Sequence, residues 1–132
     1  MKYYFIILAF LMISSCHTPK DFSAANLLGT WYLIEEIDFS RERKSSSPEM
    51  CMYLLFENDS SVVIGNKLFG HKQTAKYNIF GTFLLLEKQA GIMDTFLIEV
   101  LGKDKLSLSY KQPDEIPTRI FSRAKNSFCN KK

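Results

Sequence analysis

The side chains that could take part in catalysis or metal binding are few and widely separated in this chain. The two histidines, His17 and His71, do not form the HxH or HExxH spacing that binds zinc. Cys51 and Cys129 have no neighbouring histidine in the sequence, and the serines belong to no nucleophile-elbow motif. We therefore expect no enzymatic activity, no metal site and no cofactor.

The third cysteine, Cys16, follows an apolar segment at the start of the chain. One positive charge, Lys2, precedes an uncharged run from Tyr3 to Ile13, and two serines follow it. This order is typical of a secretory signal peptide. As a helix the run would span about 17 Å, which is shorter than the roughly 30 Å hydrocarbon core of a bilayer. A transmembrane helix is therefore not expected.

Residues 13–16, Ile-Ser-Ser-Cys, resemble the lipobox of bacterial lipoproteins. The resemblance implies that residues 1–15 are removed as a lipoprotein signal peptide and that Cys16 becomes the lipid anchor. Several acyl chains on one residue, at about 0.8 kcal/mol per buried methylene, give stable attachment to a membrane. Cys16 is then not available for a disulfide.

Removal of the signal peptide would leave a polar lipidated tether at residues 16–26 and one domain at residues 27–132. In the lipoprotein family, a residue such as His17 after the cysteine favours the outer membrane of the cell envelope, with the periplasmic and the surface face both open. The chain has 17 Lys and Arg against 14 Asp and Glu, a net charge of +3. Such a small charge on an exported protein argues against a nucleic-acid partner.

From Gly29 onward the chain divides into short runs rich in β-branched and aromatic residues, separated by turn sequences such as Asn58-Asp59-Ser60. The connections are too short for helices, which predicts an antiparallel meander. An open meander would leave two exposed edges, so we predict an all-β fold, an eight-stranded antiparallel up-and-down barrel. The predicted strands are 29–39, 50–58, 61–65, 71–80, 81–89, 94–101, 105–110 and 118–124.

Gly29-Thr30-Trp31, at the start of the first predicted strand, resembles the G-x-W signature of lipocalins and their fatty-acid-binding relatives. The resemblance implies that Gly29 allows a tight turn, that Trp31 closes the barrel floor, and that an arginine near the end of the last strand covers the tryptophan. Arg123 is the preferred match for this arginine, and Arg119 is the second. With the lipobox, residues 28–123 resemble the small bacterial lipocalin-like lipoproteins.

Four residues are candidates for contact with a ligand inside such a barrel. Glu35 lies on the face of Trp31 if strict alternation continues, whereas a bulge or a solvated rim would remove it from the lumen. Phe96 belongs to the clearly alternating strand 94–101. Tyrosines are amphipathic contacts in a lumen but also ordinary strand residues, so both interpretations stay open for two of them. The candidates are Glu35, Tyr77, Phe96 and Tyr110.

Cys51 and Cys129 are the remaining thiols, and an oxidising compartment favours their pairing. Cys51 begins the second predicted strand at the end opposite Trp31, whereas the last strand ends at the floor. The two thiols can meet only if the tail after Arg123 runs up the outside of the barrel. Both a disulfide and two free thiols therefore remain open.

These features lead to two hypotheses about function. The first is a membrane-anchored lipocalin-like lipoprotein that binds a small apolar or amphipathic molecule through the end opposite Trp31. The second is an envelope protein-interaction module on the same barrel, an inhibitor or a complex subunit without a ligand. It is suggested by residues 52–56 and 83–87, which are apolar on both faces of their strands. A monomer with a cavity favours the first hypothesis, and self-association favours the second.

Overall fold

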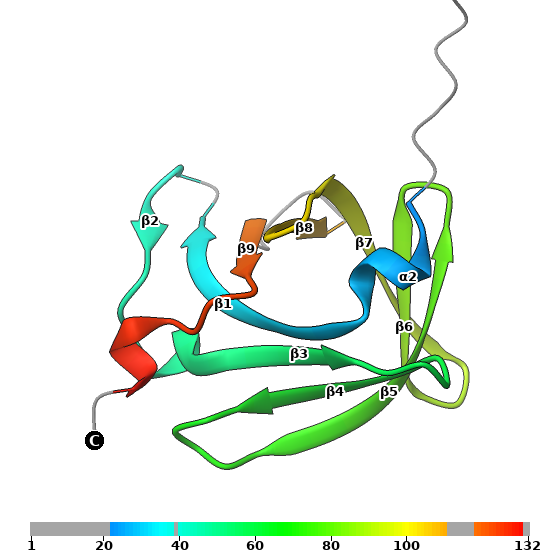
Figure 1. Ribbon diagram of the computed structural model, residues 1–132, viewed down its shortest axis with the longest axis horizontal. Coiled ribbons are helices and arrows are strands. Elements are labelled where there is room, and N and C mark those ends of the chain that lie inside the picture. Colours follow the sequence, from blue (N-terminus) through cyan, green and yellow to red (C-terminus); the bar gives the residue numbers. More distant parts are fainter. Residues whose placement is uncertain (1–21, 39, 111–117, 131–132) are drawn as a thin grey trace, which may run out of the picture.

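The computed structural model describes residues 22–38, 40–110 and 118–130 of this 132-residue chain. Within these residues, eight long antiparallel strands follow one another around a sheet that closes where β1 pairs with β9 (Figure 1). The predicted all-β, eight-stranded up-and-down barrel is confirmed. The strands are β1 (Gly29–Ile37), β3 (Met52–Phe56), β4 (Ser61–Asn66), β5 (Lys72–Phe80), β6 (Phe83–Gln89), β7 (Ile92–Leu101), β8 (Lys105–Tyr110) and β9 (Thr118–Ser122).

Alternate positions of these strands fill the interior of the barrel. In β6, for example, Leu84 and Leu86 are buried whereas Phe83 and Leu85 keep part of their surface exposed. Burial of the inward side chains removes apolar surface from water, which is the main favourable term in folding. The largest fully buried side chains are Trp31, Phe56, Phe121, Leu27, Leu33, Met50, Leu84, Leu106 and Val62.

β1 closes the barrel because it changes partner along its length. Its first residues pair with β3 as far as Tyr32, and its later residues pair with β9 from Tyr32 to Ile37. We call the end of the barrel at Gly29 the floor and the opposite end, beyond Ile37, the mouth. The register shifts at three places, in β1 between residues 33 and 35, in β6 between residues 87 and 89, and in β7 between residues 98 and 100.

A short helix precedes the barrel at the floor. Helix α2 (Ala24–Leu27) begins after Ser23, whose hydroxyl accepts a hydrogen bond from the Ala25 amide, and it leaves Leu27 fully buried. Residues 24–26 are therefore folded, although the sequence analysis assigned them to the tether. The buried side chain of Leu27 fixes this turn against the core.

The connection between β1 and β3 also has structure that the sequence did not predict. It contains the two-residue strand β2 (Arg43–Lys44), which pairs with the end of β1, and the 3-10 turn η1 (Pro48–Cys51). The second strand consequently starts at Met52, not at residue 50. The side chains of Met50 and Cys51 are buried, although both residues belong to η1 and not to the strand.

Part of the apolar outer surface of β3 is covered by the chain itself. Tyr53 faces Gly65 on β4, and a Cβ atom at Gly65 would meet the Tyr53 ring at 2.5 Å, so any other residue there would force the ring to move. Lys67 lies over the ring of Tyr32, with its Nζ 5.2 Å from the ring centroid. The double-sided apolar pattern of residues 52–56 thus reflects cross-strand packing as well as the core.

Candidate functional site

The floor of the barrel is built around Trp31, which is completely buried. The indole Nε1–H donates to the carbonyl oxygen of Leu27 at 2.8 Å, and the guanidinium carbon of Arg123 lies 3.7 Å from the ring centroid. Arg123 also donates to the carbonyl oxygens of Asn26 at 3.1 Å and Thr30 at 3.5 Å. Burial lowers the pKa of its guanidinium group. Arg123, the preferred of the two arginines, is thus the one that covers the tryptophan.

Gly29 is required by the same arrangement. Its φ of +102° lies in a region that other residues rarely adopt, and a Cβ atom would stand 2.8 Å from Nη1 of Arg123. A side chain at this position would both strain the backbone and push the guanidinium away from Trp31. Gly29, Trp31 and Arg123 therefore form one structural unit that closes the floor.

Arg119, the second arginine considered, lies near the mouth. It stands opposite Glu36 in the pairing of β1 with β9, and its Nε donates to Oε2 of Glu36 at 3.1 Å. Both side chains keep part of their surface in solvent, 35% for Arg119 and 25% for Glu36. Arg119 lines the lumen cavity described below, whereas Arg123 does not.

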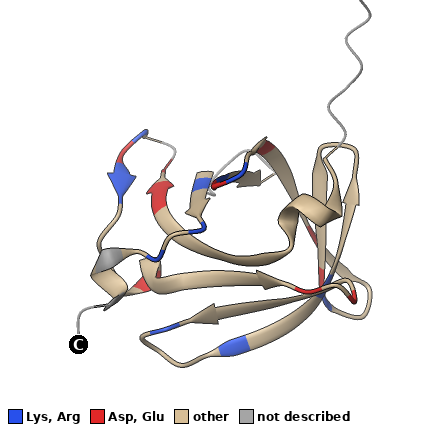
Figure 2. Cartoon of the chain, in the orientation of Figure 1, with Lys and Arg blue, Asp and Glu red and all other residues tan. Residues whose placement is uncertain are grey.

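A β-bulge in β1 decides which glutamate stands beside Arg119. Strict alternation would have turned Glu35 into the lumen, whereas a bulge would turn it away. The register shifts between Leu33 and Glu35, so the structure contains the bulge. Glu35 pairs with Nη1 of Arg43 at 3.1 Å, and Figure 2 shows the basic strand β2 beside the acidic end of β1. Glu35 does not line the lumen cavity described below. The bulge brings Glu36, not Glu35, opposite Arg119, and neither glutamate is among the described residues that line the cavity.

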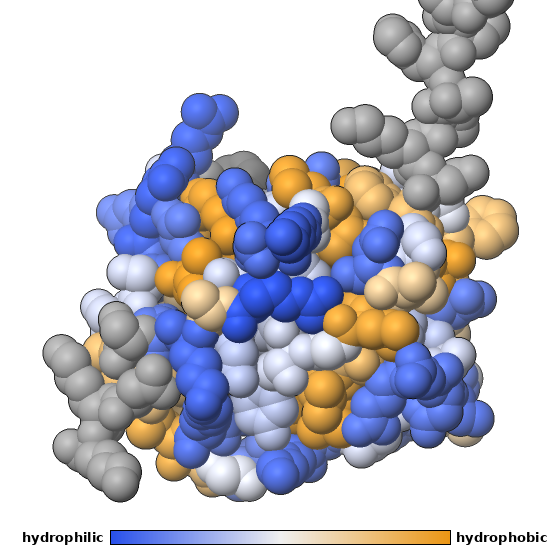
Figure 3. All heavy atoms as spheres, viewed as in Figure 1, coloured by the Kyte–Doolittle hydropathy of each residue, from blue (hydrophilic) through white to orange (hydrophobic). Residues whose placement is uncertain are grey.

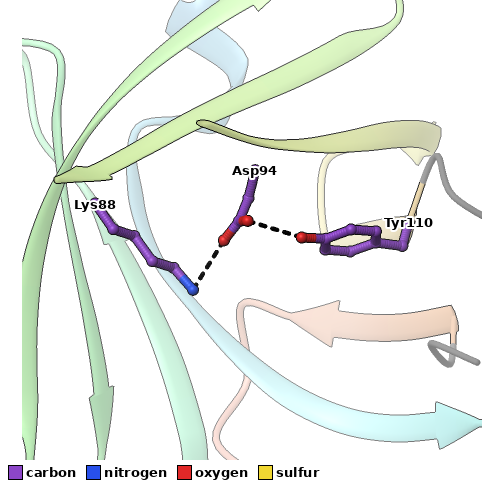
Figure 4. A network of polar contacts seen from close by, with 3 residues as sticks. All are labelled: Lys88, Asp94 and Tyr110. Carbon is purple, nitrogen blue, oxygen red and sulfur yellow. Dashed lines mark hydrogen bonds and ion pairs between the residues drawn. The ribbon is translucent and has the colours of Figure 1, made fainter. Parts of the chain in front are cut away.

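Three side chains from neighbouring strands form a polar network in the lumen (Figure 4). The carboxylate of Asp94 lies between Lys88 and Tyr110, with Oδ2 2.9 Å from Nζ of Lys88 and Oδ1 accepting from the Tyr110 hydroxyl at 2.7 Å. The hydrogen bond from Tyr110, followed by that from Lys88, holds the pKa of Asp94 below its usual value. The same bond raises the pKa of Tyr110. Near neutral pH Asp94 is therefore a carboxylate and Tyr110 a neutral phenol.

The remaining lumen candidates separate into two groups. Phe96 and Tyr110 lie edge to face with their ring centroids 5.0 Å apart, and Phe96 lines the cavity. Tyr77 is only 7% exposed, packs edge to face against Phe56, and donates its hydroxyl to the carbonyl of Glu57 at 3.1 Å. Tyr77 therefore belongs to the packed core, with its one polar atom already satisfied, and it does not line the cavity.

A cavity of about 60 Å³ remains in the lumen. One water molecule in the liquid occupies about 30 Å³, and pockets for drug-sized ligands measure roughly 300–1,000 Å³. Most of the lumen is therefore filled by side chains. Among the described residues, the cavity is lined by Met52, Leu54, Ile64, Leu86, Phe96, Leu108 and Phe121 together with the two cations Lys88 and Arg119.

The pairing of β5 with β6 stops short of the mouth. Their pairing extends from the floor only as far as Lys76 and Glu87, where the bulge in β6 begins. We call the unpaired stretch of the two strands beyond these residues the β5–β6 opening. It holds a hollow of about 370 Å³ lined by Ser61, residues 74–76 and residues 87–90. Lys88 lines both this hollow and the lumen cavity, so its side chain stands between them.

Sequence reasoning did not identify Lys88, Asp94 or Glu36. A signal existed for two of them. Lys88 continues the inward alternation of Leu84 and Leu86, and Asp94 lies two residues before Phe96 and so on the same inward face of its strand. No comparable signal existed for Glu36, whose position depends on the bulge.

The C-terminal tail returns from the floor along the outside of β1. The side-chain amide of Asn126 donates to the carbonyl of Leu33 at 3.4 Å. Cys129, in the 3-10 turn η2 (Ser127–Asn130), forms a disulfide with Cys51 near the mouth, with a Cα–Cα distance of 5.4 Å. Of the two alternatives for these thiols the structure contains the bridged one, and the tail follows the outer path that the pairing requires. In Figure 1, α2 and η2 accordingly lie at opposite sides of the barrel.

Several predictions concern residues beyond the described part of the chain. Cys16, the predicted signal peptide at 1–15 and residues 16–21 of the tether lie outside it. Among residues 22–38, 40–110 and 118–130, no helix has the length and hydrophobicity needed to cross a membrane. The same residues contain no group of three or more His, Cys, Asp or Glu side chains arranged to hold a metal ion. The lipid anchor and the expected lack of metal, cofactor and catalysis stay predictions.

No protein-family model matches the chain, and no curated protein matches it. Among solved structures, a lipocalin-like protein from Bacteroides uniformis ATCC 8492 is similar, with a TM-score of 0.59 and 17% sequence identity. The likeness covers 75% of this chain and 99% of that chain. The chain has a lipocalin-like fold. At this identity the likeness concerns the fold alone, so what the barrel binds must be argued from its own residues.

Proposed function

We propose that this chain is a lipid-anchored, lipocalin-like protein of the bacterial cell envelope, held on the outer membrane through Cys16, and that its barrel binds a small amphipathic molecule. The cavity in the lumen carries the binding proposal. Among the described residues, seven apolar side chains line it, and the two polar groups are the charged ends of Lys88 and Arg119. Such a surface is complementary to a molecule with an apolar body and one polar end.

The size of the cavity supports a small ligand that is only partly enclosed. The cavity of about 60 Å³ and the hollow of the β5–β6 opening, about 370 Å³, share Lys88 in their linings. It shares Met52 and Ile64 with a further open hollow of about 470 Å³. A ligand would place one end among the inward side chains and leave the rest in an open hollow.

Native mass spectrometry tests the binding proposal. The chain from His17 to Lys132, which contains every described residue, would be exported to a bacterial periplasm and purified without detergent. A small co-purifying mass that is lost on denaturation is the expected result, and it would identify the ligand class directly. Protein that stays free of small molecules, also after incubation with a mixture of short and medium-chain amphiphiles, would contradict the proposal.

The anchor is supported by the Ile-Ser-Ser-Cys motif at residues 13–16. Full-length protein labelled with radioactive palmitate in bacteria should carry label that is lost in Cys16→Ala. The neighbouring His17→Ala variant is the matched control and should keep the label. Equal labelling of the wild type and Cys16→Ala would exclude Cys16 as the lipid-bearing residue.

An interaction module is the second candidate, and the exposed apolar residues favour it. Leu68 and Phe69 follow β4, and Ile92 and Met93 begin β7, so both pairs lie in hairpins at the mouth end. The face seen in Figure 3, by contrast, mixes hydrophilic and apolar side chains and has no single continuous apolar area. Sedimentation equilibrium separates the candidates, because a self-associating module should become monomeric when Phe69 is replaced by Ser, whereas a carrier is already monomeric.

A further inference from the structure

Two ion pairs border the cavity, and each presents its cation to the interior space. Lys88 and Arg119 line the cavity, whereas their partners Asp94 and Glu36 are not among the described residues that line it. The cation is also the more exposed member of each pair, at 39% against 22% for Lys88 and Asp94 and 35% against 25% for Arg119 and Glu36. A molecule that enters the cavity therefore meets positive charge before it meets either carboxylate.

Lys88 is the cation placed to receive an entering group. The bulge in β6 puts it at the edge of the β5–β6 opening, and it lines both the hollow and the cavity. Its ammonium group has three donors, of which the contact with Asp94 at 2.9 Å uses one. Arg119 lines the cavity but not the hollow, and its Nε donates to Glu36 within the wall between β1 and β9.

Asp94 keeps a partner if Lys88 turns toward a ligand. Its Oδ1 accepts the hydroxyl of Tyr110 at 2.7 Å, independently of the Oδ2 contact with Lys88. The edge-to-face contact with Phe96 holds the Tyr110 ring in place. The ammonium group of Lys88 can thus also bind a second anion, because Asp94 keeps the hydrogen bond from Tyr110. An unpaired carboxylate in the lumen would be energetically costly.

We infer that the ligand is an amphipathic anion, whose negative head binds Lys88 in the β5–β6 opening and whose apolar end enters the cavity. This inference rests on the proposed function and names its ligand class and its site. The negative head of the ligand is bound at the β5–β6 opening, not at the mouth opposite Trp31.

Calorimetric titration with two matched probes tests the inference. Decanoate and 1-decanol have the same chain and differ in the charge of the head, and the protein is the exported chain from His17 to Lys132. Decanoate should bind more tightly than decanol by about tenfold, as expected for a hydrogen bond assisted by charge. Added salt should weaken the binding of decanoate and leave that of decanol unchanged.

Two variants in the network should act in opposite directions. Lys88→Met removes the ammonium and should weaken decanoate binding about tenfold, with decanol unaffected. Asp94→Asn removes the competing carboxylate and should tighten decanoate binding. Lys88→Met combined with Asp94→Asn separates loss of the cation from exposure of the carboxylate, and it should bind both probes alike. Lys105→Met, on β8 at the floor and away from both spaces, is the matched control.

The outcomes distinguish this inference from the proposed function. If neither decanoate nor decanol binds the wild type, the binding function itself fails. If both bind equally and Lys88→Met changes neither affinity, the barrel is a carrier but the anion site is wrong. If Lys88→Met and Asp94→Asn weaken both probes to the same extent, the network is only structural, and the inference is also overturned.

Discussion

Replacement of Trp31 by alanine tests the floor of the barrel most directly. The side chain is fully buried, and its loss should lower the free energy of unfolding by about 3–5 kcal/mol, the usual cost of truncating a large buried aromatic residue. The upper part of this range applies because two further contacts disappear, the hydrogen bond to the Leu27 carbonyl and the stacking of Arg123 at 3.7 Å.

Thermal unfolding followed by circular dichroism measures this effect. For a domain of this size, 1 kcal/mol corresponds to about 4 °C in Tm, so the loss of about 4–5 kcal/mol should make the variant melt about 16–20 °C below the wild type. Phe80→Ala is the matched control, because Phe80 is 75% exposed and its truncation should move Tm by no more than about 2 °C.

A second measurement distinguishes the floor from a general loss of packing. If Arg123 depends on the tryptophan, Arg123→Met should destabilise the wild type by about 1 kcal/mol or more and should have a smaller effect in the Trp31→Ala background. A Trp31→Ala protein that melts within about 3 °C of the wild type would refute the assigned role of Trp31. Strict additivity of the two substitutions would refute the role of Arg123 as its cover.

Three further predictions concern the rest of the barrel. Gly29→Ala should cost about 2 kcal/mol in urea unfolding, because of its φ of +102° and the 2.8 Å approach of Arg123, and an unchanged midpoint would contradict this reason. Replacing Cys51 and Cys129 together by Ser opens a loop with a sequence separation of 78 and should cost about 2–4 kcal/mol, and equal stability of wild type and variant would show that the tail is held by other contacts. Because the folded-state pKa of Asp94 is lowered, its contribution to stability is present above about pH 4 and is lost as the pH falls. Asp94→Asn should therefore lose less stability than the wild type between about pH 4 and pH 2, and parallel curves would contradict this.

The fold could be predicted from the sequence because two strong patterns agree. Inward apolar residues recur at every second position, as in Leu106 and Leu108, and the short connections leave antiparallel pairing as the solution. The G-x-W resemblance then gave the roles of Gly29 and Trp31, which depend on local geometry that glycine and tryptophan alone provide. Arg123 followed from the same resemblance together with its place at the end of the last strand.

The folded turn before the barrel and the path of the tail could not be predicted in this way. Helix α2 consists of four residues, too few for any periodic signal, and it is fixed by burial of Leu27 and not by helix propensity. The tail after β9 has no strand pattern, and its position depends on Asn126 and on the Cys51–Cys129 bond. Contacts of this kind join distant parts of the chain, and the two cysteines alone left both a disulfide and two free thiols open.

The candidate site shows why regular patterns predict a scaffold better than the groups that act on it. Strict alternation along β1 placed Glu35 in the lumen, but the bulge after Leu33 moves the pairing with Arg119 to Glu36. The bulge in β6 likewise ends the pairing with β5 and leaves Lys88 between the cavity and the β5–β6 opening. A bulge disrupts the hydrogen-bond ladder between two strands locally, and it changes the direction of a side chain. In this barrel two such departures define which charges a ligand would meet, so the site is set where the strands cease to be regular.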